Sequence, residues 1–584
     1  MRNFFKIFFA SLLALIIFTL IGFFILVGLI SSAASPNKPE IKSNAVLVLD
    51  LTKQYKEQKD ESVLGAFTSN SDNDIPGLYD VVRMIDYAKT DNSVKGIYIK
   101  CDDNVNGFAA SEELRNALTD FKKSRKFIIA YGDVISQKAY YLATAADKVY
   151  CNPKGLVDWR GMASTLFFIK GTLERLEIQP QIFYAGKFKS ATEPLREYQM
   201  TEANRLQTSV YLNDLYSRML SAVSEKTKVD TASLHNLANQ GAIKTAYDAL
   251  HYKLIDGVKY DDEVKSEIIG KLGIKDTAKI NYVSLGKYAK ATDFKKSGGD
   301  RIALIYAEGE IKDGKGEDGE IGSDDYRNLI RKVRMDKNIK AIVFRVNSPG
   351  GSALASEEIW RELTLAKKDK PVVVSFGDVA ASGGYYISCN ADSIFAQPNT
   401  ITGSIGVFGI IPNMKNFFNK KLGITFDAVK TGPFADMLGV NRPLNDAEKK
   451  FIQNSIDTIY DAFKGRVSEG RKLSLANVDS IAQGRVWTGK RALQIHLVDR
   501  LGNINDAINC ASRMAKLKSY TLKEYPEKKS FFEKIFNDYK NDVKTKTIKE
   551  EIGEEQYTIF KQLKSIRKMV AIPQARLPFE ISIQ

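Results

Sequence analysis

The most prominent hydrophobic pattern is an uncharged apolar run near the beginning of the chain. Between Ile7 and Ile30 the sequence has no charged residue, and Arg2 and Lys6 precede the run. As a helix rising 1.5 Å per residue, it would extend roughly 36 Å, enough to cross a hydrocarbon core about 30 Å thick. Because a secretory signal has a shorter apolar region, we expect residues 1–44 to hold an uncleaved transmembrane anchor with a cytoplasmic N-terminus.

After the anchor, short apolar runs alternate with segments in which apolar residues recur at helical spacing. Strand–helix alternation predicts an α/β fold built from parallel βαβ units. In two predicted helices, a serine followed by acidic residues suggests an N-cap at Ser111 and at Ser356. The predicted strands are Gly96–Lys100, Phe127–Ala130, Ala341–Arg345 and Pro371–Ser375, and the predicted helices are Ser111–Lys122, Tyr140–Ala146, Ser356–Lys367 and Tyr385–Asn390.

These elements occur twice, at a constant offset of 245 positions. The matching pairs include Asp91/Asp336, Glu112/Glu357, Gly132/Gly377, Tyr140/Tyr385, Asp147/Asp392, Pro153/Pro398 and Gly161/Gly406. Such a register indicates two copies of one domain, which we expect at 45–290 and 300–525, with the linker near 284–300. The Lys/Glu-rich remainder, 526–584, is predicted to form peripheral helices and a loose tail.

Composition narrows the possible functions. The net charge is +15, but the lysines are scattered without interleaved aromatic residues, so we expect no nucleic-acid partner. The four cysteines have no metal-binding spacing, so we expect buried free thiols and no metal or other cofactor. None of the three histidines lies near a Gly/Ser-rich turn, which leaves a Ser-His-Asp triad without support. These histidines are His235, His251 and His496.

The second copy has residues suited to acyl transfer that the first copy lacks. Ser382 stands where the first copy has Gln137, and Ser404 stands where it has Trp159. The pair Gly350-Gly351 follows a predicted strand and has no counterpart in the first copy. Glycine backbone N–H groups can approach a substrate carbonyl without interference from a Cβ atom. Ser382 is predicted to lie between a strand and a helix, where a further N–H group would be available.

The first copy has a lysine that the second copy lacks. Lys189 aligns locally with Gly432, so the two copies show a reciprocal loss that one divided active site would leave. A serine hydroxyl needs a base, and a lysine amine serves as one only when a desolvated site keeps it neutral. The neighbours of Lys189 fit such a site, because they are largely apolar: Phe183, Tyr184, Phe188 and Ala191.

With these motifs the chain resembles the long, duplicated form of signal peptide peptidase A, a family of Ser-Lys proteases. The most specific motifs are Asn347–Gly351, Gly377–Tyr386, Thr402–Gly406 and Gly186–Ala191. The resemblance extends from the anchor to about residue 520. It implies an α/β fold of two tandem ClpP/crotonase-like domains, built from ββα superhelix units, behind a single transmembrane helix.

The resemblance also implies roles for individual residues. Ser382 would attack the peptide carbonyl, Lys189 would take its proton, and Ser404 would hold the lysine in place. N–H groups of Gly383 and of Gly350-Gly351 would form the oxyanion hole. The implied protein is a membrane-anchored endopeptidase that cuts remnant signal peptides and other apolar peptides. It would form a homo-oligomer, a tetramer, in the bacterial inner membrane with its catalytic body on the periplasmic side.

Two other classes of protein compete with this interpretation. A crotonase-type enzyme would use paired N–H groups to hold an acyl-CoA thioester, but such enzymes use acidic bases and have no use for an anchor. A non-catalytic membrane scaffold would contain the same glycine turns for structural reasons. The sequence leaves open whether Lys189 would meet Ser382 within one chain or across a subunit boundary.

Overall fold

The computed structural model describes residues 2–33, 38–59, 74–274, 280–295, 298–527 and 573–577. Its α-helices are α1 (Arg2–Ala33), α3 (Leu78–Ala88), α4 (Phe108–Phe121), α5 (Gln137–Ala143), α6 (Lys170–Arg175), α7 (Glu193–Arg196), α8 (Glu202–Thr227), α9 (Thr231–Asn239), α10 (Ala246–His251), α11 (Asp261–Leu272), α12 (Leu285–Ala291), α13 (Ser323–Met335), α14 (Ala353–Asp369), α15 (Gly383–Tyr386), α16 (Asp446–Arg471), α17 (Leu475–Ile481), α18 (Gly489–Gln494) and α19 (Ile504–Met514).

The strands fall into three sheets. They are β1 (Ala45–Asp50), β2 (Val94–Lys100), β3 (Phe127–Ile135), β4 (Lys148–Val157), β5 (Gln179–Ala185), β6 (Gly257–Val258), β7 (Asn281–Ser284), β8 (Asp300–Glu308), β9 (Glu310–Lys312), β10 (Glu320–Gly322), β11 (Ile339–Ser348), β12 (Gly350–Ser352), β13 (Val372–Ala381), β14 (Ser393–Ala396), β15 (Ile401–Gly403), β16 (Val407–Asn413), β17 (Val486–Thr488), β18 (Arg500–Leu501), β19 (Tyr520–Tyr525) and β20 (Gln574–Arg576).

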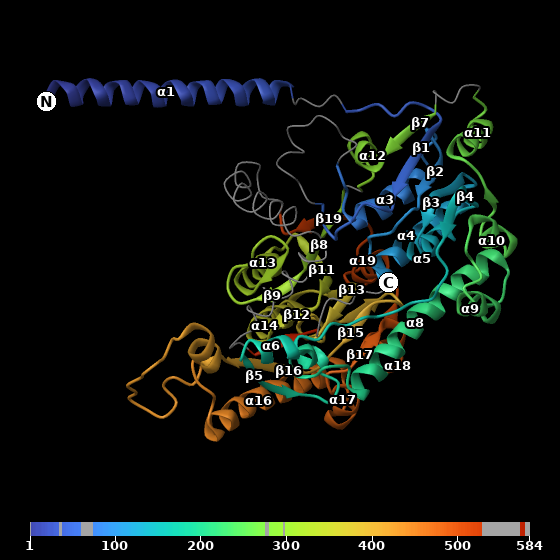
Figure 1. Cartoon of the computed structure of the whole chain (residues 1–584). Helices are drawn as coiled ribbons and strands as arrows, with labels where there is room; N and C mark the ends of the chain where they lie inside the picture. Colours follow the sequence, from blue (N-terminus) through green and yellow to red (C-terminus); the bar gives the residue numbers. More distant parts are fainter. Residues whose placement is uncertain are drawn as a thin grey trace.

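Each copy builds its own sheet, as the repeat predicts. The first copy forms a parallel sheet in the order β6-β4-β3-β2-β1-β7. The second forms the order β17-β15-β13-β11-β8-β19, in which all neighbours on this path except β15 and β17 are parallel. Helices cover the sheets of both copies (Figure 1). The predicted α/β fold with two tandem copies is therefore confirmed.

A third sheet joins the two copies, in the order β10-β9-β12-β20-β16-β5. Strand β5 comes from the first copy but pairs antiparallel with β16 of the second. The pairing runs from Ala185 opposite Val407 to Gln179 opposite Asn413. Phe183 and Ala185 of β5 accordingly lie in the hydrophobic core of the second copy. The first copy thus contributes a strand, β5, to a sheet that is built mainly from the second copy.

The predicted N-caps are wrong, because both helices begin one turn earlier. Helix α4 has Gly107 as its N-cap, and α14 has Ser352. The predicted caps, Ser111 and Ser356, lie inside the helices, where their hydroxyls donate to the carbonyls four residues before them. Because these residues lie one turn inside their helices, their hydroxyls are not placed to cap the free N–H groups at the helix start.

A carboxylate of the second copy caps helix α4 of the first copy. Gly107 has no side chain, and the carboxylate of Asp378 accepts hydrogen bonds from the N–H groups of Ala109 and Ala110 at 2.8 and 3.0 Å. A negative charge at a helix N-terminus is favourable, because the free N–H groups there have positive partial charge. Burial nevertheless raises the pKa of Asp378. The helix start is thus completed only when the two copies pack together.

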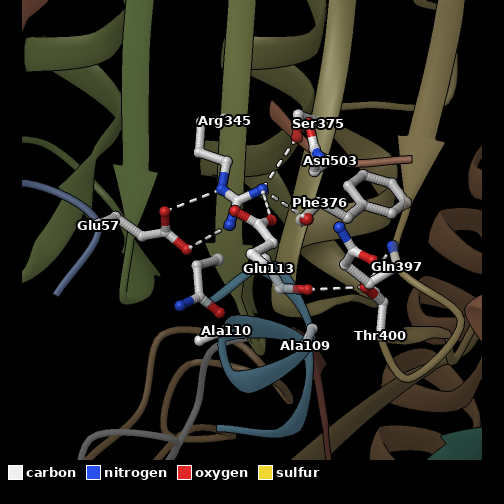
Figure 2. A network of polar contacts seen from close by, with 12 residues as sticks. Glu57, Ala109, Ala110, Glu113, Arg345, Ser375, Phe376, Gln397, Thr400 and Asn503 are labelled. Carbon is white, nitrogen blue, oxygen red and sulfur yellow. Dashed lines mark hydrogen bonds and ion pairs between the residues drawn. The ribbon is translucent and has the colours of Figure 1, made fainter. Parts of the chain in front are cut away.

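A buried ion-pair network fixes the same interface (Figure 2). The Arg345 guanidinium of β11 donates to Glu57 at 2.8 and 3.1 Å and to Glu113 of α4 at 2.8 Å. It also donates to the Ser375 hydroxyl and the Phe376 carbonyl, each at 2.9 Å. Burial raises the pKa of Glu113 to about 7, although Arg345 opposes that rise. Removing one member of such a network would leave a buried charge without a partner.

Three described segments lie outside the repeated elements: helix α1, the linker helix α12 and the tail strand β20. Helix α1 extends away from the body (Figure 1), and its segment Phe4–Gly22 is long and apolar enough to cross a membrane. Part of the predicted linker is helix α12, which contacts α3 and β1. The prediction of a helical or loose tail is wrong for Pro573–Leu577, which contains strand β20. Strand β20 is stabilised by backbone pairing with β12 and β16, which requires no hydrophobic periodicity in its sequence. The remaining tail, from 528 on, lies outside the described residues.

Candidate active site

Ser382 occupies a sharp turn between β13 and α15. Its backbone has φ 55° and ψ −115°, a region that residues with a side chain seldom adopt. The Ser382 N–H donates to the Gly403 carbonyl at 2.8 Å, which ties the turn to β15. Strained backbone of this kind persists only where surrounding contacts hold it, and it is typical of functional positions. The side chain is fully buried.

Lys189 reaches Ser382 because β5 is paired with β16. After β5, Gly186 adopts φ +110°, and the chain turns back so that the Phe188 N–H donates to the Gln483 carbonyl at 2.7 Å. Gly484 lies directly against Lys189, since a methyl group on Gly484 would be 2.7 Å from the lysine Cβ and backbone nitrogen. Lys189 of the first copy therefore packs directly against Gly484 of the second copy, where a larger side chain would clash.

The structure brings three predicted residues together within one chain. The Lys189 Nζ lies 2.9 Å from the Ser382 Oγ, although the two residues are 193 positions apart. The same Nζ lies 3.1 Å from the Ser404 Oγ and 3.2 Å from the Ser404 carbonyl oxygen. A neutral amine has two N–H donors and one lone pair. If Ser404 accepts both N–H groups, the lone pair faces the Ser382 hydroxyl.

Burial determines the protonation of this amine. Lys189 is 1% exposed. Complete desolvation holds the pKa of its amine well below the usual range for lysine. Water no longer stabilises the ammonium form, so the neutral form is favoured at a lower pH than in solution. The site therefore combines two features that a lysine base needs, which are burial that favours the neutral amine and a hydroxyl within hydrogen-bond reach.

The glycine turn lies beside the serine. Gly350 has φ +93°, a conformation that favours glycine, and its N–H donates to the Ser348 hydroxyl at 3.1 Å. That N–H is consequently engaged within the turn. Gly383 is the first residue of α15, where N–H groups have no partner inside the helix. Gly383 thus remains as a candidate oxyanion donor. Gly351, which lies in β12 opposite Ala575 of β20, is a second candidate, whereas Gly350 gives the turn its shape.

Sequence reasoning missed three residues that support the site. Gly484 gives Lys189 its space, and Ser348 engages the glycine turn. Gln207 of α8 donates to the Phe188 carbonyl at 3.1 Å and to the Ser190 hydroxyl at 2.9 Å, on both sides of the lysine. Ser348 lies inside the motif Asn347–Gly351, although the motif gave it no role, whereas a single glycine or glutamine has no recognisable sequence signal. Only their positions in the fold give these residues a role.

Other side-chain chemistry is sparse in the part of the chain that the structure describes. There, no three His, Cys, Asp or Glu side chains are grouped so that they could hold a metal ion. All four cysteines lie in this part and are buried free thiols, as expected: Cys101, Cys151, Cys389 and Cys510.

Comparison with known proteins shows the family to which the chain belongs. Peptidase family S49 matches the chain at residues 120–275 and again at 364–518, once in each copy. The chain is 35% identical over 481 residues to Protease 4 of Salmonella typhi, covering 80% of this chain and 76% of that protein. It is 35% identical over 451 residues to the chloroplastic serine protease SPPA of Arabidopsis thaliana, covering 75% and 66%.

Among solved structures, the chain is similar to a ClpP1 mutant of Listeria monocytogenes. This similarity covers 35% of this chain and 94% of that one, at 15% identity and a TM-score of 0.24, which is too weak to build on. The fold and the sequence matches together define a serine peptidase with two tandem copies of the peptidase domain. The chain belongs to peptidase family S49.

Proposed function

We propose that this peptidase cleaves its substrates with a Ser-Lys dyad formed by Ser382 and Lys189. The observation that supports this most directly is the 2.9 Å separation of the Lys189 Nζ and Ser382 Oγ, with both side chains buried. Ser404 positions the amine, because its hydroxyl and its carbonyl oxygen both lie within 3.2 Å of Nζ. No cofactor or metal takes part in the proposed reaction.

The proposed reaction has two steps. In the first, Lys189 removes the hydroxyl proton as Ser382 attacks the peptide carbonyl carbon, and the proton then passes to the departing amine. In the second, Lys189 takes a proton from water, which attacks the ester and restores the free serine. The N–H groups of Gly351 and Gly383 stabilise the negative oxygen that forms each time. Gly350 contributes through its turn, because its own N–H is bonded to Ser348.

Peptides are the substrates, and we propose apolar ones, remnant signal peptides among them. The resemblance to signal peptide peptidase A supports this choice. We also propose a single pass through the bacterial inner membrane, with a cytoplasmic N-terminus and the body on the periplasmic side. The apolar segment Phe4–Gly22 supports the anchor, and the basic residues before it support the orientation. Protease accessibility of the body in spheroplasts, compared with lysed cells, tests the orientation.

We further propose that the chain forms a homo-oligomer, a tetramer as the resemblance implies. The segment 414–442 projects from the body beside β5 and α16 (Figure 1) and exposes a group of large apolar side chains. Exposed apolar groups of this size mark interaction sites in soluble domains. The group consists of Leu422, Ile424, Phe426, Val429, Phe434 and Leu438. Light scattering of the detergent-solubilised chain measures the number of subunits.

The dyad is tested by hydrolysis of a fluorogenic apolar peptide. We expect Ser382→Ala and Lys189→Met each to abolish turnover, while Lys187→Met, an exposed lysine two positions earlier, retains it. Because the pKa of Lys189 is lowered, kcat/KM of the native chain should rise with pH through that pKa and then level off. Turnover at the native rate by either dyad variant would refute the role assigned to that residue.

A further inference from the structure

The loop that contains Lys189 is bonded on both sides of the lysine to one buried side chain. The Gln207 amide nitrogen donates to the Phe188 carbonyl at 3.1 Å and to the Ser190 hydroxyl at 2.9 Å. Gln207 lies in α8 and is 3% exposed, so water competes little for these hydrogen bonds. A side chain that bonds to both neighbours of Lys189 restricts the movement of the lysine backbone.

The same amide also bonds to the strand beside the nucleophile. The Val486 N–H donates to the Gln207 Oε1 at 3.3 Å. Val486 of β17 is the register partner of Gly403 in β15, and the Gly403 carbonyl accepts the Ser382 N–H at 2.8 Å. One amide therefore connects the loop of the base, which belongs to the first copy, with the strands that hold the nucleophile in the second copy.

Helix α8 is itself fixed on either side of Gln207. Near its start, Asn204 donates to the buried carboxylate of Glu193, in α7, at 2.8 Å. Further along, the Asp214 carboxylate accepts hydrogen bonds from the Arg491 guanidinium at 2.5 and 2.9 Å. Since Arg491 belongs to α18, helix α8 of the first copy lies against the second copy (Figure 1). Gln207 thus extends from a helix that is held to both copies.

The position of the lysine amine affects both its reactivity and its pKa. The Lys189 Nζ lies 2.9 Å from the Ser382 Oγ and 3.1 Å from the Ser404 Oγ. A displacement of about 1 Å in such a site can cost about 100-fold in rate. Desolvation lowers the pKa of Lys189, so a looser loop that admits water would raise that pKa.

We propose that Gln207 is the positioning residue for the lysine base. Its amide fixes the lysine loop against β17 and thereby sets the distance between the Lys189 Nζ and the Ser382 Oγ. This inference rests on the proposed dyad. Gln207 acts through the residues on either side of Lys189 and takes no part in proton transfer. A neutral amide suits this position, because a carboxylate there would favour the charged form of the neighbouring amine.

The test is hydrolysis of the fluorogenic apolar peptide by the full-length Gln207→Met chain, with kcat and KM measured as functions of pH. Methionine is also unbranched, but it cannot donate to Phe188 or Ser190. We expect kcat to fall about 10- to 100-fold with little change in KM, and the rising part of the pH profile to move to higher pH. Gln240→Met, the same exchange at an exposed glutamine of the first copy, should change none of these.

Ser190→Ala is a second, milder variant, because it removes one acceptor of the Gln207 amide. We expect a smaller fall in kcat and a shift of the pH profile in the same direction. The double variant should lose little more than Gln207→Met, since both substitutions break the same contact. Losses that multiply in the double variant would mean that the two residues act separately, which would contradict the proposal.

The remaining outcomes separate this inference from the dyad itself. Native kcat and an unchanged pH profile in Gln207→Met, with Lys189→Met inactive, would refute the positioning role and leave the dyad standing. Native turnover by Lys189→Met would refute the dyad and the inference with it. A lower kcat with an unchanged pH profile would show that Gln207 only supports the fold. If Gln207→Met does not fold, the pH profile of Ser190→Ala decides, and an unchanged profile refutes the proposal.

Discussion

Replacing Lys189 by methionine should remove activity and at the same time stabilise the fold. The lysine is completely buried, and burial lowers the pKa of its amine, so the unfolded chain binds a proton that the folded chain releases. Stability then depends on pH, because the two states bind different numbers of protons. The penalty is largest below the folded-state pKa and declines as pH rises toward the unfolded value of about 10.4.

The size of the effect follows from these protonation states. At a pH below the folded-state pKa, each pH unit by which burial lowers the pKa of this amine costs about 1.4 kcal/mol of folding free energy. Methionine avoids this penalty but loses the contacts with Ser382 and Ser404, worth about 1 kcal/mol each. Because burial holds the pKa well below the usual range for lysine, we expect the avoided penalty to exceed these lost contacts, so that Lys189→Met is more stable than the native chain at pH 7.

The assay is thermal unfolding of the full chain in detergent, followed by tryptophan fluorescence from pH 6 to pH 10. The midpoint of Lys189→Met should exceed that of the native chain at pH 7, and the difference should shrink as pH rises. Lys187→Met is the matched control, because this lysine is exposed. A Lys189→Met chain that is less stable at pH 7, by an amount independent of pH, would refute the reasoning.

Three further substitutions test the surroundings of the dyad and the interface between the copies. Ser404→Ala removes one acceptor of the lysine amine, and we expect kcat to fall about 10- to 100-fold with little change in KM and a shifted pH profile. Gly484→Ala forces a methyl group against the lysine backbone and should lower kcat similarly, whereas Gly432→Ala, with nothing within 4 Å, should not. Arg345→Met leaves two glutamates buried without their partner and should destabilise the fold by about 3–5 kcal/mol, measured as a lower unfolding midpoint, while the exposed Arg361→Met should have little effect.

The sequence by itself determined the repeated α/β domain and most of the candidate site. Local patterns contain that information, since strand and helix periodicities are properties of neighbouring residues. The constant offset between the copies then showed which residues differ, and Ser382, Ser404 and Lys189 emerged as residues without counterparts. Helix boundaries were less certain. The cap of α4 comes from Asp378 of the other copy, so no local pattern could indicate it.

Only the tertiary structure decided how these residues meet. Lys189 reaches Ser382 in the same chain because β5 leaves its own copy and pairs with β16, a contact between strands more than 200 positions apart. Such pairing depends on which strand edges remain free after both sheets have formed, and the sequence does not encode it locally. The same reason hid strand β20, since three residues are too few to show a hydrophobic pattern and pair with β12 and β16 through their backbone.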